Sequence, residues 1–159
     1  MKQLRLVSLL FVLIYCVAFG PGKASASSKS ASSAKDQRVG NKIVRFARNL
    51  LGVRYQYGGT SPASGFDCSG FVYWVWHNGD RAAEASINMP DGRTTYTMNV
   101  GTKGVKVPWK QAVAGDLVFF GDQGPKTPDA QASHTSIALG NKWIIHSSGG
   151  RAGVSITYL

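Results

Sequence analysis

Apolar residues between positions 39 and 51 recur every three or four residues, with basic residues on the opposite side. This spacing is typical of an amphipathic helix, and Gly52 follows it as a helix-ending residue. The next apolar run, 69–77, has almost no polar side, which predicts a helix that is buried all round. Asn78-Gly79 marks the end of that second helix.

The second half of the chain changes to short runs rich in β-branched and aromatic residues. Such runs, bounded by glycine and other turn residues, predict strands. A short helix is expected over 94–100, before the strands begin. Because helices come first and an antiparallel meander follows, we predict the α+β class. The expected strands are 116–120, 133–139, 142–148 and 153–159.

Residues 1–26 have the pattern of a secretory signal peptide. Basic residues precede the apolar run 6–19, and Ala24-Ser25-Ala26 supplies a cleavage site of small residues. A membrane anchor that is never cut is the alternative, but a span takes about 20 apolar residues. We therefore expect a protein secreted to the cell envelope, without stable membrane insertion after cleavage. The Ser/Ala/Lys-rich residues 27–38 predict a flexible tether, and 39–159 predict one domain.

The chain is basic, with 18 Lys and Arg residues against 8 acidic ones and a formal net charge of +10. Removal of residues 1–26 would take away Lys2, Arg5 and Lys23, which leaves 15 minus 8, or +7. This charge suits a polyanionic surface such as a cell wall. The basic residues are scattered rather than clustered with aromatic ones, so a nucleic-acid partner is not expected.

Cys68 is the single thiol outside the predicted signal peptide, which contains Cys16. It follows Asp67, a residue type that caps helices, at the start of the buried helix. There the free N–H groups and the positive end of the helix dipole favour the thiolate, which is the reactive form. A small buried structural residue is the alternative. Because a lone free thiol is a liability in an exported protein, we favour a nucleophile.

A cysteine nucleophile needs a base within hydrogen-bond reach, and the chain has three histidines. His77 lies nine residues along the helix from Cys68, about 13 Å away, and is too far. His134 and His146 lie on the two strands of a predicted hairpin. A three-residue loop would place these two directly opposite, about 5 Å apart, whereas a two-residue loop at Gly140-Asn141 would turn them to opposite faces.

The hairpin face that would carry both histidines is otherwise small and polar, and we expect the Cys68 helix to pack on it. Two histidines on one strand pair are also half of a metal site. We find no third ligand at a convincing spacing, so neither a metal nor another cofactor is expected. A cysteine, a base and an orienting histidine fit the pattern better.

Together these segments resemble the NlpC-type (NlpC/p-sixty) cell-wall cysteine peptidases, compact relatives of the papain architecture. The resemblance covers about residues 40–158, which is nearly all of the predicted domain. Its pieces appear in the family's order, and twelve residues separate the two histidines. They are residues 50–59, residues 66–72 around Asp67-Cys68-Ser69-Gly70, Met89-Pro90 with Arg93-Thr94, residues 114–120, and residues 134–146.

The resemblance implies a papain-like compact fold in which the Cys68 helix packs on an antiparallel sheet. It implies Cys68 as nucleophile, His134 as general base and His146 as the residue that orients the base. It further implies a substrate-binding and oxyanion set of Tyr55, Asp67 and Ser69, although Asp67 serves equally well as a helix cap alone. The tyrosine hydroxyl would lie near the thiol, and the first N–H groups of the helix would hold the oxyanion.

The implied activity is that of an exported peptidoglycan hydrolase, an endopeptidase that cuts stem peptides at the γ-D-glutamyl–diamino acid bond. The alternatives are an N-acetylmuramoyl-L-alanine amidase, an acyl or peptidyl transferase with the same dyad, and a non-catalytic wall-binding or regulatory domain. The sequence departs from the family at Thr135-Ser136. It also stops at Leu159, where relatives usually continue into a further strand, so we expect either a shorter sheet or a truncated product. No oligomeric state is predicted.

Overall fold

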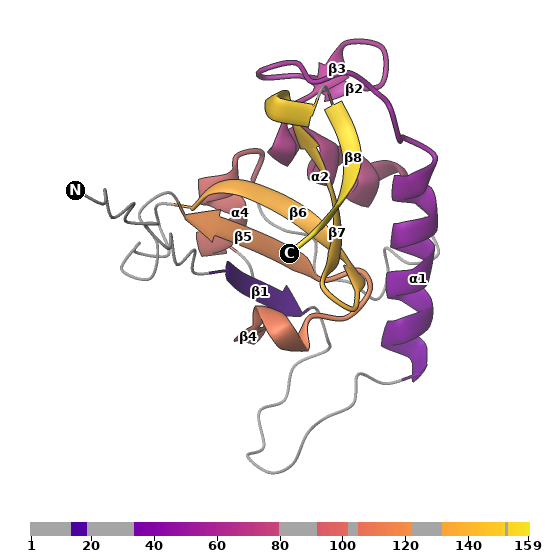
Figure 1. Ribbon diagram of the computed structural model, residues 1–159, viewed down its shortest axis with the longest axis vertical. Coiled ribbons are helices and arrows are strands. Elements are labelled where there is room, and N and C mark those ends of the chain that lie inside the picture. Colours follow the sequence, from indigo (N-terminus) through magenta and orange to yellow (C-terminus); the bar gives the residue numbers. More distant parts are fainter. Residues whose placement is uncertain (1–13, 19–33, 80–91, 102–104, 122–131, 152) are drawn as a thin grey trace, which may run out of the picture.

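A computed structural model describes residues 14–18, 34–79, 92–101, 105–121, 132–151 and 153–159 of the chain. Its centre is an antiparallel six-stranded sheet with the strand order β4-β1-β5-β6-β7-β8 (Figure 1). The strands are β1 (Ile14–Ala18), β4 (Val105–Pro108), β5 (Leu117–Gly121), β6 (Ala132–Gly140), β7 (Trp143–Ser148) and β8 (Gly153–Tyr158). The helices are α1 (Ala34–Arg48), α2 (Cys68–Asn78) and α4 (Thr95–Gly101), and the short strands β2 (Thr60–Ser61) and β3 (Gly65–Phe66) form a separate hairpin.

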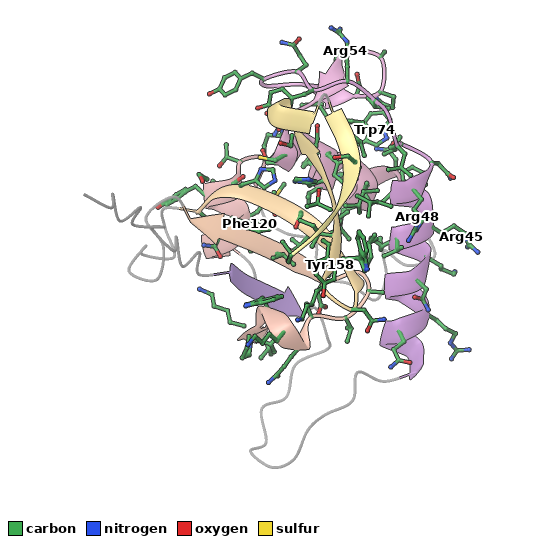
Figure 2. All side chains as sticks on the ribbon, viewed as in Figure 1. Arg45, Arg48, Arg54, Trp74, Phe120 and Tyr158 are labelled. Atoms are coloured by element: carbon green, nitrogen blue, oxygen red, sulfur yellow. The ribbon has the colours of Figure 1, made fainter. Side chains whose placement is uncertain are left out.

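The two long helices were predicted from their apolar patterns, and both are present. Helix α2 begins at Cys68, and its N-cap is Asp67, whose side chain accepts a hydrogen bond from the Gly70 N–H. Helix α1 begins earlier than expected, so residues 34–38 of the predicted tether are helical. Arg45 and Arg48 are exposed and point away from the sheet (Figure 2), as expected for the solvated face of an amphipathic helix.

The main core lies between the helices and one face of the sheet. Phe71, Val72 and Val75 of α2 are fully buried there. On the sheet side the core is formed by Leu117, Phe119, Ile137 and Ile145, α1 adds Ile43 and Ala47, and the turn after α1 adds Leu50. The expectation that α2 packs on the small, polar face of the hairpin was therefore wrong. The opposite face carries the large apolar side chains, and burying those against an apolar helix removes more area from water.

The sheet contains a strand that the sequence pattern did not predict. Strand β1, within the segment expected to be a signal peptide, pairs antiparallel with both β4 and β5. Strand β4 falls in the least periodic part of the sequence and was also missed. In the intact chain, residues 14–18 thus complete a continuous sheet, and β4 is joined to that sheet through β1.

Candidate active site

The turn between β6 and β7 sets the positions of the two histidine-bearing strands. Asn141 and Lys142 have φ values of 50° and 66°, and Gly140 pairs with Trp143 across them. Two consecutive positive φ angles are the signature of a two-residue type I′ hairpin turn. The turn is therefore not the three-residue loop that would have placed His134 directly opposite His146, and the two-residue turn lies at Asn141-Lys142 rather than at Gly140-Asn141.

A bulge in β6 corrects the register that this turn would otherwise impose. Gly140 is paired with Trp143, but Ala138 is paired with Ile144, so Leu139 is an extra residue on one strand. Without the bulge the register would put the two histidines on opposite faces, because a one-residue slip reverses every side chain. With it, both histidines lie on the same face, as the favoured prediction required.

On that face the two histidines are in direct contact. The distance between His134 Nε2 and His146 Nδ1 is 2.7 Å. Their rings are nearly perpendicular, at 78°, with centroids 5.0 Å apart. The His134 ring also packs at 5.5 Å against Phe120, which is its paired residue on β5 and is labelled in Figure 2. The His134 ring is therefore held from two sides.

The contact chain continues beyond the histidines to β8. His146 Nε2 lies 3.1 Å from the hydroxyl of Thr157. Thr157 pairs with Ile144, so it is a diagonal neighbour of His146 on the same sheet face. Thr157 was not predicted from the sequence, because its contact depends on the register of a third strand.

Cys68 is the first residue of α2, and its thiol is half-buried. Helix α2 packs on β6 and β7, the strands that carry His134 and His146 (Figure 1). A buried hydrogen bond from the Ser147 hydroxyl to the Phe66 carbonyl, 2.7 Å long, ties the strand residue after His146 to the segment before Cys68. This bond fixes the beginning of α2 relative to the histidine strand.

One hydroxyl group lies near the thiol, and a tyrosine ring lies beside the end of β7. The Thr95 hydroxyl is 3.6 Å from the Cys68 sulfur, a contact that was not predicted because it joins two helices that are far apart in the sequence. The Tyr55 ring lies beside Gly149, directly after β7, at 3.5 Å from where a Gly149 Cβ would stand. Burial raises the pKa of Tyr55 above its usual value, and the nearby Cys68 and Asp67 raise it further. Tyr55 therefore stays protonated at neutral pH and is able to donate.

Asp67 lies at the centre of a hydrogen-bond network beneath the start of α2. Its two oxygens accept hydrogen bonds from the N–H groups of Gly58 and Gly70 and from the Ser69 hydroxyl. Both terminal nitrogens of Arg93 also bind it, each at 3.1 Å. Arg93 additionally donates to Ser69, at 2.8 Å, and to the Gly59 carbonyl, at 3.1 Å. The predicted pair Asp67 and Ser69 is thus brought together, with Arg93 as a third member whose function the sequence did not indicate.

Gly70 allows this network to close. A Cβ atom at this position would overlap the carbonyl oxygen of Gly59 and would lie 2.8 Å from a guanidinium nitrogen of Arg93. Only a residue without a side chain permits the Gly59 backbone to approach α2 this closely. The glycine that follows Asp67-Cys68-Ser69 therefore serves packing at the helix start.

The ionisation of Asp67 predicts an acid-sensitive component of stability. Burial alone would raise the pKa of Asp67, but the hydrogen bonds from Arg93, Gly70 and Ser69 and the Arg93 charge outweigh it, so the pKa is lowered. Because the pKa is lower in the folded state, the ionised carboxylate stabilises the fold at pH values above the unfolded pKa of about 3.9. This stabilisation is lost as the pH falls below that value and through the folded pKa. The stability advantage of wild type over Asp67→Asn should therefore shrink below about pH 4.

Thermal unfolding of the wild type and of Asp67→Asn between pH 7 and pH 2.5 tests this expectation. Asparagine also caps helices well, so the variant should retain α2. An advantage that stays constant over the whole pH range would show that the carboxylate does not supply the acid-sensitive component.

Among the residues that the structure describes, no group of three or more His, Cys, Asp or Glu side chains is placed to hold a metal ion. In the same residues, no helix has the length and apolar character needed to cross a membrane. The side chains gathered around α2 and the β6–β7 hairpin are thus a thiol, a histidine pair and a set of hydroxyl and charged groups.

Comparison with known proteins shows the family of the chain. The model of the NlpC/P60 family matches residues 52–159, which contain Cys68 and both hairpin histidines. The chain belongs to the NlpC/P60 family. The resemblance drawn from the sequence motifs is confirmed.

Named relatives of this NlpC/P60 chain are cell-wall enzymes. It is 37% identical over 107 residues to the bifunctional muramidase/DL-endopeptidase CwlT of Bacillus subtilis, covering 67% of this chain and 28% of the relative. It is 32% identical over 136 residues to the murein DD-endopeptidase MepH of Escherichia coli, covering 86% and 46%. The chain thus spans less than half the length of either curated relative.

Solved structures agree with the fold. The NlpC/p60 domain of the peptidoglycan hydrolase SagA superposes with a TM-score of 0.60 at 30% identity, covering 75% of this chain and 88% of that domain. The peptidoglycan hydrolase RipB of Mycobacterium tuberculosis superposes with a TM-score of 0.59 at 23% identity, covering 86% and 68%. The predicted papain-like α+β fold, with helices packed on an antiparallel sheet, is therefore confirmed.

Proposed function

We propose that this protein is a cysteine endopeptidase that hydrolyses the stem peptides of peptidoglycan. The observation that carries the proposal is that Cys68 begins α2, and that α2 packs on the two strands that hold the His134–His146 pair. A nucleophile, a base and a third group that orients the base are the parts that thiol hydrolysis needs. Relatives named as murein or peptidoglycan endopeptidases, such as MepH and RipB, support the same substrate class.

In the proposed reaction, His134 accepts the proton of the Cys68 thiol, and the thiolate attacks the carbonyl carbon of the scissile amide. The first N–H groups of α2, including that of Cys68, have no acceptor within the helix and would hold the oxyanion. The protonated His134 then gives its proton to the leaving amine, which departs and leaves a thioester. His134 next takes a proton from water, and the resulting hydroxide attacks the thioester. The new carboxylic acid and the Cys68 thiolate are released, and His134 returns its proton to the thiolate, which restores the thiol.

We propose the γ-D-glutamyl–diamino acid bond as the site of cleavage. Two relatives support it by name, namely CwlT as a DL-endopeptidase and the γ-DL-glutamyl hydrolase of Bacillus subtilis, which is 32% identical over 115 residues. MepH is named a DD-endopeptidase and favours a D,D bond as the second candidate. The masses of the products separate these two, and also an amidase or a transferase.

We further propose that residues 1–26 direct export and that the protein acts in the cell envelope. Export is supported by the basic residues Lys2 and Arg5, the apolar run 6–19 and the small residues at 24–26. Tyr55, whose ring lies beside Gly149, and the Asp67–Ser69 pair are proposed to shape the cleft around Cys68. Stem-peptide carboxylates suit the positive charge of the chain.

Mass spectrometry of purified muropeptides incubated with the full chain tests the proposed activity. Wild type should release the γ-D-glutamyl fragment, and Cys68→Ala should release none, because the nucleophile is absent. Cys16→Ala is the matched control, since it removes the other cysteine and should cleave like wild type. Cleavage that persists in Cys68→Ala would overturn the assignment. A folded wild type that binds muropeptides without cutting them would instead identify a wall-binding domain.

A further inference from the structure

Three side chains form a continuous hydrogen-bonded chain across the sheet, from β6 through β7 to β8. His134 Nε2 lies 2.7 Å from His146 Nδ1, and His146 Nε2 lies 3.1 Å from the Thr157 hydroxyl. In a neutral imidazole one nitrogen donates and the other accepts, so the proton on one ring decides the proton on the next. The chain therefore has two self-consistent arrangements, which differ in direction.

In the first arrangement, His146 Nε2–H donates to the Thr157 oxygen, and His146 Nδ1 accepts from His134 Nε2–H. The lone pair of His134 is then on Nδ1, outside the chain. In the second arrangement, the Thr157 hydroxyl donates to His146 Nε2, and His146 Nδ1–H donates to His134 Nε2. His134 then carries its proton on Nδ1. Only the first leaves the outer nitrogen of His134 able to accept a proton.

Protonation of His134 distinguishes the two arrangements further. The imidazolium ring carries protons on both nitrogens. In the first arrangement His134 Nε2–H already donates to His146, so the charged ring fits without any change. In the second arrangement two N–H groups would face each other across 2.7 Å. A base that gains and loses a proton in each turnover therefore needs the first arrangement.

We infer that Thr157 is a positioning residue that fixes the histidine tautomers by accepting a hydrogen bond from His146 Nε2–H. This inference rests on the proposed function, because it assigns the direction of the chain from the need for a base at His134. Thr157 acts through the two histidines and does not itself touch the reacting atoms. It extends the constellation of cysteine and two histidines by a fourth side chain from β8.

The position of Thr157 on the sheet supports this role. Ser155, not Thr157, is the residue paired with His146 across the β7–β8 ladder. The Ser155 hydroxyl is nevertheless buried without a hydrogen-bond partner among the described residues, so the nearer hydroxyl does not serve His146. His146 reaches instead to the diagonal position. Thr157 is half-buried, which partly shields the bond from competing water.

Nitrogen-15 NMR of the histidine rings in the full chain measures the tautomers directly. Wild type at neutral pH should show His146 protonated on Nε2 and neutral His134 protonated on Nε2. Thr157→Val, which removes the acceptor at nearly constant shape, should shift His146 toward the Nδ1–H form. Thr157→Ser, which keeps a hydroxyl, should retain the wild-type pattern. A wild-type His146 protonated on Nδ1, or an unchanged pattern in Thr157→Val, would overturn the inference.

Kinetics of muropeptide hydrolysis give the second readout. Thr157→Val should lower kcat about tenfold, the equivalent of one neutral hydrogen bond, with KM unchanged and the serine variant close to wild type. If wild type cleaves and Thr157→Val has the same kcat, the inference fails while the proposed function stands. If wild type shows the expected tautomers but cleaves no muropeptide, the proposed function fails while the assignment of the hydrogen-bond direction stands.

Discussion

Replacing His134 with glutamine is expected to lower kcat for muropeptide hydrolysis by about 10²–10⁴-fold, the range that a general base contributes. Glutamine retains a polar group that can meet His146, so the hairpin should stay folded. It has no ring nitrogen that can accept the thiol proton and return it to the leaving amine. The loss should therefore appear in kcat more than in KM.

His77→Gln is the matched control for this experiment. His77 stacks on Tyr73 near the exposed end of α2, with ring centroids 3.7 Å apart, and its Nδ1 lies 2.8 Å from the Tyr73 carbonyl oxygen. The same substitution there should leave kcat and KM unchanged. The melting temperatures of both variants should stay close to that of wild type. A His134→Gln protein with wild-type kcat would remove His134 from the mechanism.

The histidine pair shows how far sequence patterns reach in this protein. The sequence predicted that His134 and His146 lie on the two strands of one hairpin and share a face, because strand alternation and the hairpin signal are local. The register was not, because it depends on a type I′ turn at Asn141-Lys142 combined with a bulge at Leu139. The turn alone or the bulge alone would shift the pairing register by one residue. Together they keep both histidines on the same face of the sheet.

The missed residues share one property, namely that their contacts cross between distant elements. Thr95 reaches Cys68 across 27 positions, and Arg93 reaches Asp67 across 26. Thr157 meets His146 only because β8 follows β7 in a particular register. A sequence pattern reports which face a residue occupies within its own element. It carries no information on which residue of another element will stand opposite.

The packing face of α2 was wrong for a different physical reason. We expected α2 on the histidine face because the small residues there would let a helix approach closely. The fold instead follows the apolar area, which is concentrated on the face with Ile137 and Ile145. The histidine face keeps a smaller apolar cluster, formed by Val118, Ala138 and Ile144. The polar chain from His134 to Thr157 lies on this second face, on strands that α2 also contacts.

Replacing Cys16 with proline is expected to lower the melting temperature of the intact chain by about 10 °C. Strand β1 is an interior strand, and Cys16 is paired with Val107 on one side and Val118 on the other. Proline has no N–H to donate and is confined to edge strands and bulges. A backbone defect of about 3 kcal/mol corresponds to roughly that shift in a chain of this size.

Cys16→Ala is the control, because it changes the same side chain without disturbing the backbone, and it should melt within a few degrees of wild type. A chain of residues 27–159 should melt at or below the proline variant, since it lacks β1 and leaves β4 without the strand that joins it to the sheet. Wild type and all three variants should be produced without export, so that no signal peptidase removes residues 1–26 from the proteins that contain them.

The experiment decides between two roles for one apolar segment. A continuous run of apolar residues suits an interior strand as well as the central region of a signal peptide, so composition alone does not separate them. If proline at position 16 and removal of residues 1–26 both leave the melting temperature unchanged, β1 contributes nothing to the folded domain, and the segment is free to serve export. If both lower it, export with cleavage would leave the edge of β5 open, and the released domain would need another strand there to recover the stability of the intact chain.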